Sequence, residues 1–279
     1  MDKCKHLNTS VSKGQYLSKS LCHQNEIEIQ EMESIPYAQV VSSLMYAITS
    51  TRLDICHAVG LVSRYQSNPG KTHWQAVKRI FRYLQGTKNM GLYFGMSDLE
   101  IVGFTNADFA GHADDRKSTS GYVLLFGGKA VSWLSKKQSC VAKSTMEAKY
   151  ISWSIAVSNV VSIKCFIESS NLDLNSKPIN MFCNKKSAIS LIKSGVQSSK
   201  GKYIDVNYHY IQDIVERGEI YYLIRDGGRS YDQRIVVGKI QRACSYNGIK
   251  KLGDSCISNK AQMEGFEDAR MNNFVQFCF

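Results

Sequence analysis

Apolar residues recur with two different spacings along the chain, and the change of spacing separates a helical part from a mixed part. Spacings of three and four residues, typical of amphipathic helices, run through three segments: residues 37–48, 51–66 and 72–84. The sequence Asn68-Pro69-Gly70 marks a turn between the last two segments. The first part of the chain is therefore predicted to be a small group of helices.

Further along the chain, short apolar runs alternate with longer helical patterns. Strands are predicted at residues 100–108, 120–126, 130–135, 179–183 and 219–224, and helices at residues 145–170, 186–194 and 204–217. This content predicts an α/β fold, a mixed sheet with flanking helices. The patterns divide the chain into a loose polar arm (1–33), a helical segment (34–98), the α/β domain (99–226) and a tail (227–279).

Composition places the chain among soluble globular proteins. It has 279 residues, of which 43% are hydrophobic and 21% charged. The net charge of +11 fits a partner that carries phosphates, but a basic solubilising surface explains it equally well. The nine cysteines form no C-x-x-C pair, which argues against a zinc site and for reduced thiols, with Cys183 a small core residue. No transmembrane run is apparent, and we expect no membrane partner.

Three short segments carry chemistry. They are GFTNADFAG at residues 103–111, STMEAKYI at 144–151 and MFCNKKSA at 181–188. Together they resemble the ribonuclease H domain of copia-type retrotransposon polyproteins, where they read G-[YF]-[ST]-D-A-D-W-A-G, S-S-T-E-A-E-Y-I and L-Y-C-D-N-Q-S-A. Residues 37–95 resemble the end of the reverse transcriptase of the same polyproteins and its connection to ribonuclease H. The resemblance implies a ribonuclease H-like mixed sheet with flanking helices, preceded by a small helical segment.

In the family that this chain resembles, three acids of these segments bind two Mg²⁺ ions, which clamp the attacking and leaving oxygens during cleavage of an RNA–DNA hybrid. The matching positions here are Asn106, Glu147 and Asn184, so the charge falls from −3 to −1. Mg²⁺ prefers carboxylate oxygens, and a neutral amide is a weaker ligand. We therefore expect these three positions to converge on one pocket that has lost its metals, in a pseudoenzyme without a cofactor.

Neighbouring residues offer little replacement. Asp108 lies two residues after Asn106 on a predicted strand, on the same side but displaced by roughly 6.5 Å. Lys149, in place of a family Glu, is rotated by roughly 200° from Glu147 on a predicted helix, and we expect it to point away.

Two other acids and one histidine look like metal ligands in isolation. Asp114 and Asp115 are better explained as polar residues of a hairpin turn. His209 matches a family histidine, but without metals we expect it on a helix surface.

The predicted helix at residues 72–84 combines an apolar face with a basic one. By the resemblance, Lys71, Lys78, Arg79 and Arg82 would follow a nucleic-acid backbone, such as that of an RNA–DNA hybrid. A solvated helix face explains the same residues.

The resemblance ends near Arg225. The family continues with a helix that carries a fourth metal-binding acid, whereas residues 227–279 match nothing recognisable, as a frameshift or a fusion would produce. We expect this tail to pack poorly. The first residues resemble an internal stretch of the polyprotein, and they lack the apolar core of a signal peptide.

Three functional hypotheses remain open. The chain is a catalytically dead fragment in the cytoplasm or nucleus, at most a weak binder of nucleic acid or protein. Alternatively, it is a secreted effector that binds a host protein, since oomycete RxLR effectors include copia-like sequences. The segment Arg79-Ile80-Phe81-Arg82 is a degenerate form of their motif. The third hypothesis is a residual RNA–DNA hybrid nuclease.

Overall fold

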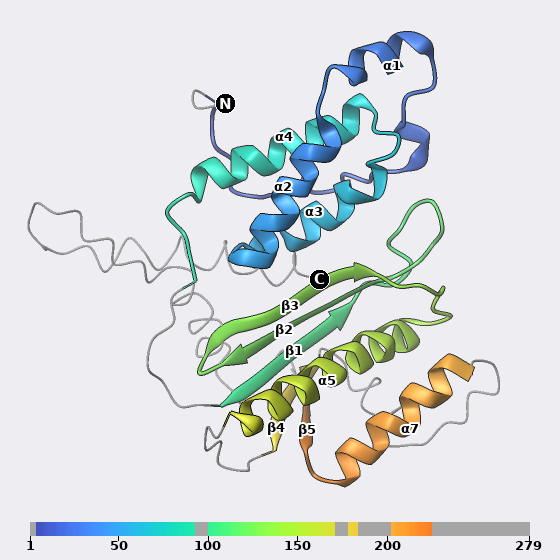
Figure 1. The fold of residues 1–279 in the computed structure, drawn as a ribbon. Helices are drawn as coiled ribbons and strands as arrows, with labels where there is room; N and C mark the ends of the chain where they lie inside the picture. The colour runs from blue at the N-terminus through green and yellow to red at the C-terminus, as the bar shows by residue number, and fades with distance from the viewer. Residues whose placement is uncertain (1–3, 93–99, 171–177, 184–201, 225–279) are drawn as a thin grey trace, which may run out of the picture. The chain divides into compact units, whose positions relative to one another are not determined.

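The computed structural model describes residues 4–92, 100–170, 178–183 and 202–224. The chain divides into two compact units, with the boundary between Tyr93 and Phe94 (Figure 1). The predicted helix at 186–194 and the tail at 227–279 lie outside the described residues.

The first unit is helical. Its α-helices are α1 (Glu26–Glu33), α2 (Tyr37–Ser50), α3 (Cys56–Val62) and α4 (Lys71–Gly86), with short 3-10 turns at Lys19–Leu21, Leu53–Ile55 and Ser63–Tyr65. Their apolar faces meet in one core, in which Val41, Ile55 and Val77 have no exposed surface. The predicted helices at 37–48 and 72–84 are confirmed as α2 and α4.

The helix predicted over residues 51–66 was wrong as a single element, because a 3-10 turn precedes α3 and another follows it. Arg52 explains the first break. Its guanidinium pairs with Asp54 at 2.7 Å and donates to the hydroxyl of Thr87 at 2.6 Å. This long-range contact fixes a tight local turn that helical spacing could not reveal.

The expectation of a loose arm at residues 1–33 was also wrong for the described part of that stretch. Asn25 caps α1 by accepting a hydrogen bond from the Glu28 amide, and Met32 is buried. Leu17 is only 8% exposed, and its carbonyl accepts a 2.8 Å hydrogen bond from the Tyr65 hydroxyl. A few apolar residues in a polar stretch were enough to fix it on the helices.

Gly70 shows how closely the N-terminal residues approach α4. A Cβ built at Gly70, the residue before α4, would lie 1.9 Å from the Leu21 carbonyl oxygen. Only glycine permits this approach without a shift of the backbone.

The second unit contains a five-stranded mixed sheet. Its elements are β1 (Ile101–Ala107), β2 (Thr119–Phe126), β3 (Lys129–Lys137), α5 (Thr145–Ser169), β4 (Ile179–Cys183), α7 (Lys202–Glu216) and β5 (Ile220–Ile224). The strand order is β3-β2-β1-β4-β5. β1, β2 and β3 pair antiparallel, whereas β4 lies parallel to both β1 and β5. The predicted α/β fold with a mixed sheet and flanking helices is confirmed.

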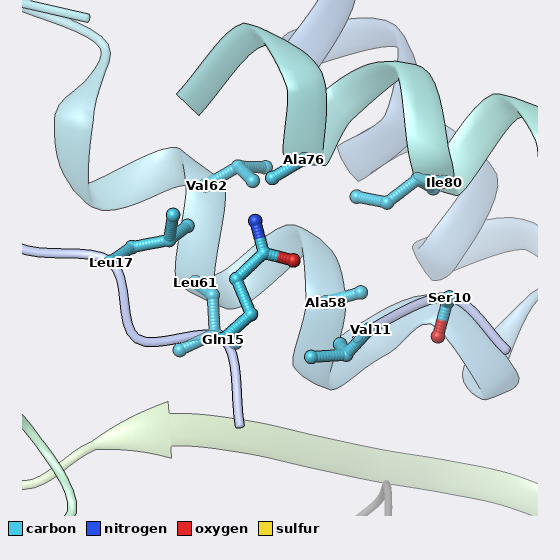
Figure 2. A pocket seen from close by; sticks show the side chains of 9 residues that line it. All are labelled: Ser10, Val11, Gln15, Leu17, Ala58, Leu61, Val62, Ala76 and Ile80. Atoms are coloured by element: carbon cyan, nitrogen blue, oxygen red, sulfur yellow. The ribbon is translucent and has the colours of Figure 1, made fainter. Parts of the chain in front are cut away.

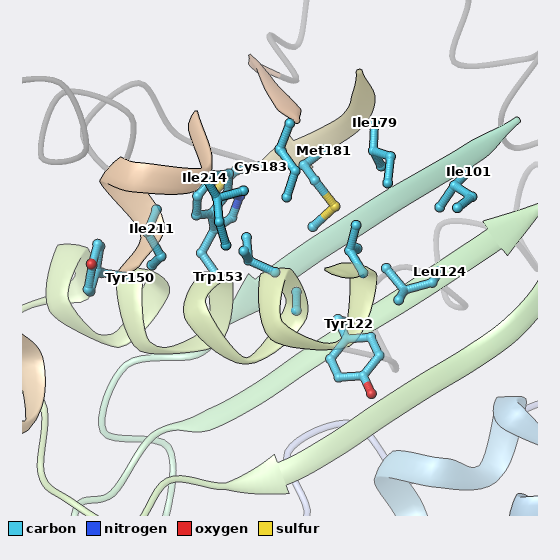
Figure 3. Close-up of a cluster of buried hydrophobic side chains, with 14 of the residues drawn as sticks. Ile101, Tyr122, Leu124, Tyr150, Trp153, Ile179, Met181, Cys183, Ile211 and Ile214 are labelled. Atoms are coloured by element: carbon cyan, nitrogen blue, oxygen red, sulfur yellow. The ribbon is translucent and has the colours of Figure 1, made fainter. Parts of the chain in front are cut away.

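The core of the second unit lies between the sheet and α5, with α7 beside α5 (Figures 1 and 3). Trp153 is completely buried there, and Cys183 is a buried core residue as predicted. Gly103 in β1 makes room for the neighbouring strand, since a Cβ there would lie 2.0 Å from the Met181 sulfur. The first glycine of the GFTNADFAG segment therefore has a packing role.

Helix α5 has 25 residues and a mean hydropathy of 1.4 over its most apolar window, enough by length and composition to cross a membrane. However, half of that window is buried inside the unit, and the helix packs on β1 and β2. Its apolar character is therefore accounted for by the core of the α/β unit, since a helix that is hydrophobic all round is often a buried one.

Candidate functional site

The candidate site lies where the C-terminal end of β1 meets the N-terminal half of α5. Ser152 of α5 joins the two elements, because its hydroxyl donates to the Asn106 carbonyl at 2.6 Å and lies 3.0 Å from the Thr105 hydroxyl. Both hydroxyl-bearing residues are buried. This contact fixes the backbone of Asn106 against the helix that carries Glu147.

The side chain of Asn106 is half-buried, and its Oδ1 atom is buried without a hydrogen-bond partner. A buried acceptor without a partner costs free energy, about 1–3 kcal/mol. The Asn106 backbone is therefore fixed by Ser152, but nothing among the described residues bonds the Oδ1 atom of its amide.

Glu147 takes part in the hydrogen bonding at the N-terminus of α5, where Ser144 is the cap residue. It stands in the first turn of α5, where its amide donates to the Ser144 hydroxyl at 3.1 Å. Its carboxylate accepts a 2.7 Å hydrogen bond from the Lys143 amide. The arrangement is a variant of a capping box: Ser144 satisfies a free amide of the helix, whereas the Glu147 carboxylate bonds the amide of the residue before the cap. The one acid retained at the three site positions therefore has a structural role.

Asn184, the third predicted site residue, lies outside the described residues. The last residue of β4, Cys183, is paired with Thr105, the residue before Asn106. The described register therefore ends one position short of the expected site, and convergence of the three positions stays a prediction.

Asp108 makes a structural hydrogen bond. β1 ends at Ala107, and the Asp108 carboxylate accepts a hydrogen bond from the Thr119 amide at the start of β2. A Cβ built at Gly111 would lie 2.3 Å from the other oxygen of this carboxylate. Asp108 thus closes the connection between the two strands, and this hydrogen bond leaves it poorly suited to bind a metal in place of residue 106.

Lys149 is buried in α5, with 6% of its surface exposed. Its direction relative to the candidate pocket stays a prediction.

His209 is exposed on α7, as expected of a residue on the helix surface.

Asp114 and Asp115 lie in the connection between β1 and β2. The Asp115 carboxylate is 2.6 Å from His112 Nδ1 and 2.9 Å from the Lys137 amine. Burial alone would raise its pKa, but hydrogen bonds from Lys137 and from the Lys117 amide, with His112 nearby, lower the pKa to about 2. These contacts fit the hairpin-turn interpretation.

The described residues do not fit a two-metal centre. Within residues 4–92, 100–170, 178–183 and 202–224, no group of three or more His, Cys, Asp or Glu side chains could hold a metal ion. Asn106 and Glu147 supply one carboxylate between them, and that carboxylate accepts a backbone hydrogen bond. Mg²⁺ needs several hard oxygen ligands in near-octahedral geometry, which this pair does not provide.

Each of the four predicted nucleic-acid-binding residues has a contact within the first unit. Lys71 pairs with Glu31, and the Lys78 amine lies 5.8 Å from the centre of the Trp74 ring. Both lysines are exposed. Their charges remain accessible to a phosphate backbone.

The two arginines are held by the N-terminal segment. Arg79 donates to the Thr9 hydroxyl at 2.7 Å, and Arg82 donates to the Lys5 carbonyl at 2.8 Å. Between them, Ile80 is 1% exposed and Phe81 packs at the edge of the core. The degenerate RxLR-like segment is therefore a stretch of core-packed helix rather than an accessible linear motif.

The hydroxyls of Thr105 and Ser152 were missed by sequence reasoning. Ser152 occurs in a strongly apolar helix, five residues after Glu147. A polar residue on a buried helix face is the pattern that could have indicated it, since buried hydroxyls need a partner.

Several curated proteins are similar in sequence. The Retrovirus-related Pol polyprotein from transposon TNT 1-94 of Nicotiana tabacum is 44% identical over 216 residues, 77% of this chain. The corresponding polyprotein from transposon RE2 of Arabidopsis thaliana is 35% identical over 66% of the chain. The chain spans only 16% and 13% of these two relatives. The Secreted RxLR effector protein 161 of Plasmopara viticola is 44% identical over 131 residues, which is 92% of its length and 47% of this chain.

No model of a known protein family matches the chain. Among solved structures, the ribonuclease H1 LC11, isolated from compost, aligns with 46% of this chain and 86% of its own, at 10% identity and a TM-score of 0.34. A foamy viral protease-reverse transcriptase in complex with double-stranded DNA aligns with 78% of this chain and 37% of its own, at 14% identity and a TM-score of 0.43. These scores are low, so the fold assignment rests on strand order and on the sequence relatives.

Proposed function

Because the chain belongs to the family of copia-type retrovirus-related Pol polyproteins, we propose that it is a non-catalytic ribonuclease H-like fragment that binds nucleic acid without cleaving it. The proposal depends on the chemical groups and hydrogen bonds at two site positions. Asn106 offers an amide where the family segment has an acid, and Glu147 takes part in the hydrogen bonding at the N-terminus of α5. Two-metal hydrolysis depends on anionic ligands that this pair lacks.

Charge supports the binding part of the proposal. The chain carries a net charge of +11, and Lys71 and Lys78 are exposed on α4. Sequence-independent binding to phosphates needs only such cationic side chains. It weakens steeply with rising salt, because the cations of the salt compete with the side chains for the phosphates. The proposed partner is therefore a nucleic-acid backbone, an RNA–DNA hybrid included, without preference for base sequence.

A cleavage assay tests the catalytic part. The full chain is incubated with a labelled RNA–DNA hybrid in Mg²⁺ or Mn²⁺, beside the variant Glu147→Gln, which keeps an acceptor for the Lys143 amide. The expected result is an intact hybrid in both samples. Metal-dependent cleavage by the unmodified chain that the variant lacks would establish the residual-nuclease hypothesis instead. Equal cleavage in both would indicate a contaminating nuclease.

A titration tests the binding part. Affinity for the hybrid is measured from 50 to 200 mM salt, where the loss for several phosphate contacts is on the order of 10³-fold. Replacement of Lys71 and Lys78 by glutamine should weaken binding and reduce the salt dependence. Absent or salt-insensitive binding would contradict the proposed partner.

A second candidate function is that of a secreted effector, favoured by the 92% coverage of the Plasmopara viticola protein. In this role the chain would act by binding a host protein. The test is detection of the tagged chain in the medium of an oomycete that expresses it. A protein confined to the cells would contradict secretion and leave the cytoplasmic or nuclear location that we propose for the fragment.

A further inference from the structure

The N-terminal segment crosses α3 and α4 in two parts that are held differently. Residues 10–17, which we call the anchor, contact the helices through Ser10, Val11, Gln15 and Leu17, as Figure 2 shows. Ser10 and Leu17 are 5% and 8% exposed, and the Tyr65 hydroxyl bonds the Leu17 carbonyl. The remaining space between the anchor and the helices is about 10 Å³, enough for roughly one water molecule. This gap is therefore no ligand pocket, and the anchor is packed onto the helices at Ser10 and Leu17.

Residues 5–9, which we call the flap, lie on α4 with much less burial. Lys5, His6 and Asn8 are exposed. Three hydrogen bonds hold the flap: the two from Arg79 and Arg82, and one of 3.2 Å from the Leu7 amide to the Arg82 carbonyl. Segments with few buried contacts open at low free-energy cost, so the flap is the part of this segment that can leave first.

The contacts between the flap and α4 bring together positively charged groups without a negatively charged one. The flap contains the basic residues Lys5 and His6 and no acid, and its contacts with α4 include two guanidinium groups. Both guanidinium groups are bonded to neutral acceptors, a hydroxyl and a carbonyl. Burial and the neighbouring Arg82 lower the pKa of Arg79, and its buried Nε atom has no hydrogen-bond partner among the residues that the structure describes. An anion would relieve this repulsion, because guanidinium bonds to phosphate are stronger than those to neutral acceptors.

We propose that the flap covers a phosphate-binding site formed by Arg79 and Arg82. A nucleic-acid backbone displaces the flap, and each guanidinium exchanges its neutral acceptor for phosphate oxygens. Arginines three residues apart lie on the same helix face, so both can reach one strand. The inference rests on the nucleic-acid binding proposed above and adds an intramolecular competitor to it.

A reversible cross-link tests the flap in the full chain. A Cβ built at Gly86 would lie 3.1 Å from the Cβ of His6, close to the separation of about 3.8 Å in disulfides. In the double variant H6C/G86C, oxidation should hold the flap on α4, and a reducing agent should release it. Affinity for a labelled single-stranded DNA is expected to be about tenfold weaker in the oxidised form, roughly the effect of one lost charge-assisted hydrogen bond. The parent chain, treated identically, controls for its own cysteines.

Two further sets of variants assign the effect to the arginines. Adding R79Q/R82Q to the cross-linked protein should remove the difference between oxidised and reduced forms. Adding K78Q/K88Q, which removes the same charge from exposed positions, should weaken binding but keep that difference. The variant Thr9→Val, which deletes one acceptor and preserves side-chain shape, should bind two- to threefold more tightly, because it loosens the flap.

The outcomes separate the two proposals. Measurable and equal binding in both redox forms would overturn the flap and leave nucleic-acid binding standing. A redox difference that survives R79Q/R82Q would place the covered site elsewhere and overturn the assignment. Absence of binding in every form would reject the proposed function, and the flap with it.

Discussion

The α/β unit and the helical unit differ in the state of the residues that were predicted to be functional. In the α/β unit, the apolar core between the sheet and α5 contains fully buried side chains such as Trp153, while the site position Asn106 carries an amide. In the helical unit, the cations of the predicted binding surface are present, but their partners lie within the chain, such as Thr9 for Arg79 and Lys5 for Arg82. In our proposal one unit keeps the scaffold without its chemistry, whereas in the other the arginine side chains make hydrogen bonds within the fold.

The difference shows that fold and chemistry depend on separate residues here. Neither Asn106 nor Glu147 belongs to the main core cluster of the α/β unit. Burial of apolar area supplies most of the driving force for folding, whereas the family's metal site depends on a few carboxylates. Changes at those carboxylates can therefore remove catalysis while the sheet persists.

The largest expected effect is in the core. Trp153→Ala should lower the free energy of unfolding by about 3–5 kcal/mol, because a fully buried aromatic side chain is replaced by a cavity. Urea denaturation followed by circular dichroism measures this loss. Phe166→Ala on the same helix is the control, since Phe166 is 71% exposed and should cost less than about 0.5 kcal/mol. Equal losses would contradict the described core.

A middle-sized effect should appear at the retained acid. Glu147→Ala removes the acceptor of the Lys143 amide and should cost about 1 kcal/mol, whereas Glu147→Gln should be nearly neutral. The comparison of the two variants in urea separates a cap from a charge. If alanine is tolerated as well as glutamine, Glu147 has no capping role, and the argument that the last acid is structural fails.

The smallest effect concerns Asp115. Its pKa of about 2 lies below the ordinary 3.8, so it stabilises the folded state above about pH 4 and loses this contribution as pH falls toward 2. The side chain is 35% exposed, and solvent screening limits the loss in Asp115→Asn to about 0.5 kcal/mol at pH 7. The destabilisation should disappear near pH 2. Asp114→Asn serves as the matched control, and a pH-independent difference would contradict the ion pair.

Sequence alone was sufficient for the strands of the α/β unit and for helices α2 and α4, but not for α1 or for the breaks on either side of α3. The described strands agree with their predicted ranges within two residues, because alternating and continuous apolar runs report burial directly. What it missed depends on distant partners. The packing of Leu17 under Tyr65 and the turn held by Arg52 join residues 48 and 35 positions apart. No local pattern encodes such pairs.

The residues of the candidate site could be predicted from the sequence, but their hydrogen bonds could not. The segments identified Asn106 and Glu147 as site positions, but they could not show that the Glu147 carboxylate accepts a backbone hydrogen bond or that Ser152 bonds the Asn106 carbonyl. Arg79 and Arg82 were predicted to be cationic surface residues, and their hydrogen bonds to the flap follow from tertiary packing. The residue type determines which hydrogen bonds a side chain can make, and the tertiary fold determines which of them it does make.

Metal binding by the full chain tests most directly our proposal that the α/β sheet persists without a functional metal site. Mn²⁺ is titrated into the purified protein, and bound metal is counted by electron paramagnetic resonance, beside Glu147→Gln. The expected result is no saturable binding at low millimolar Mn²⁺ in either protein, because one capping carboxylate is a poor site for a divalent ion. Two equivalents of tightly bound Mn²⁺ in the unmodified chain, lost in the variant, would contradict the account.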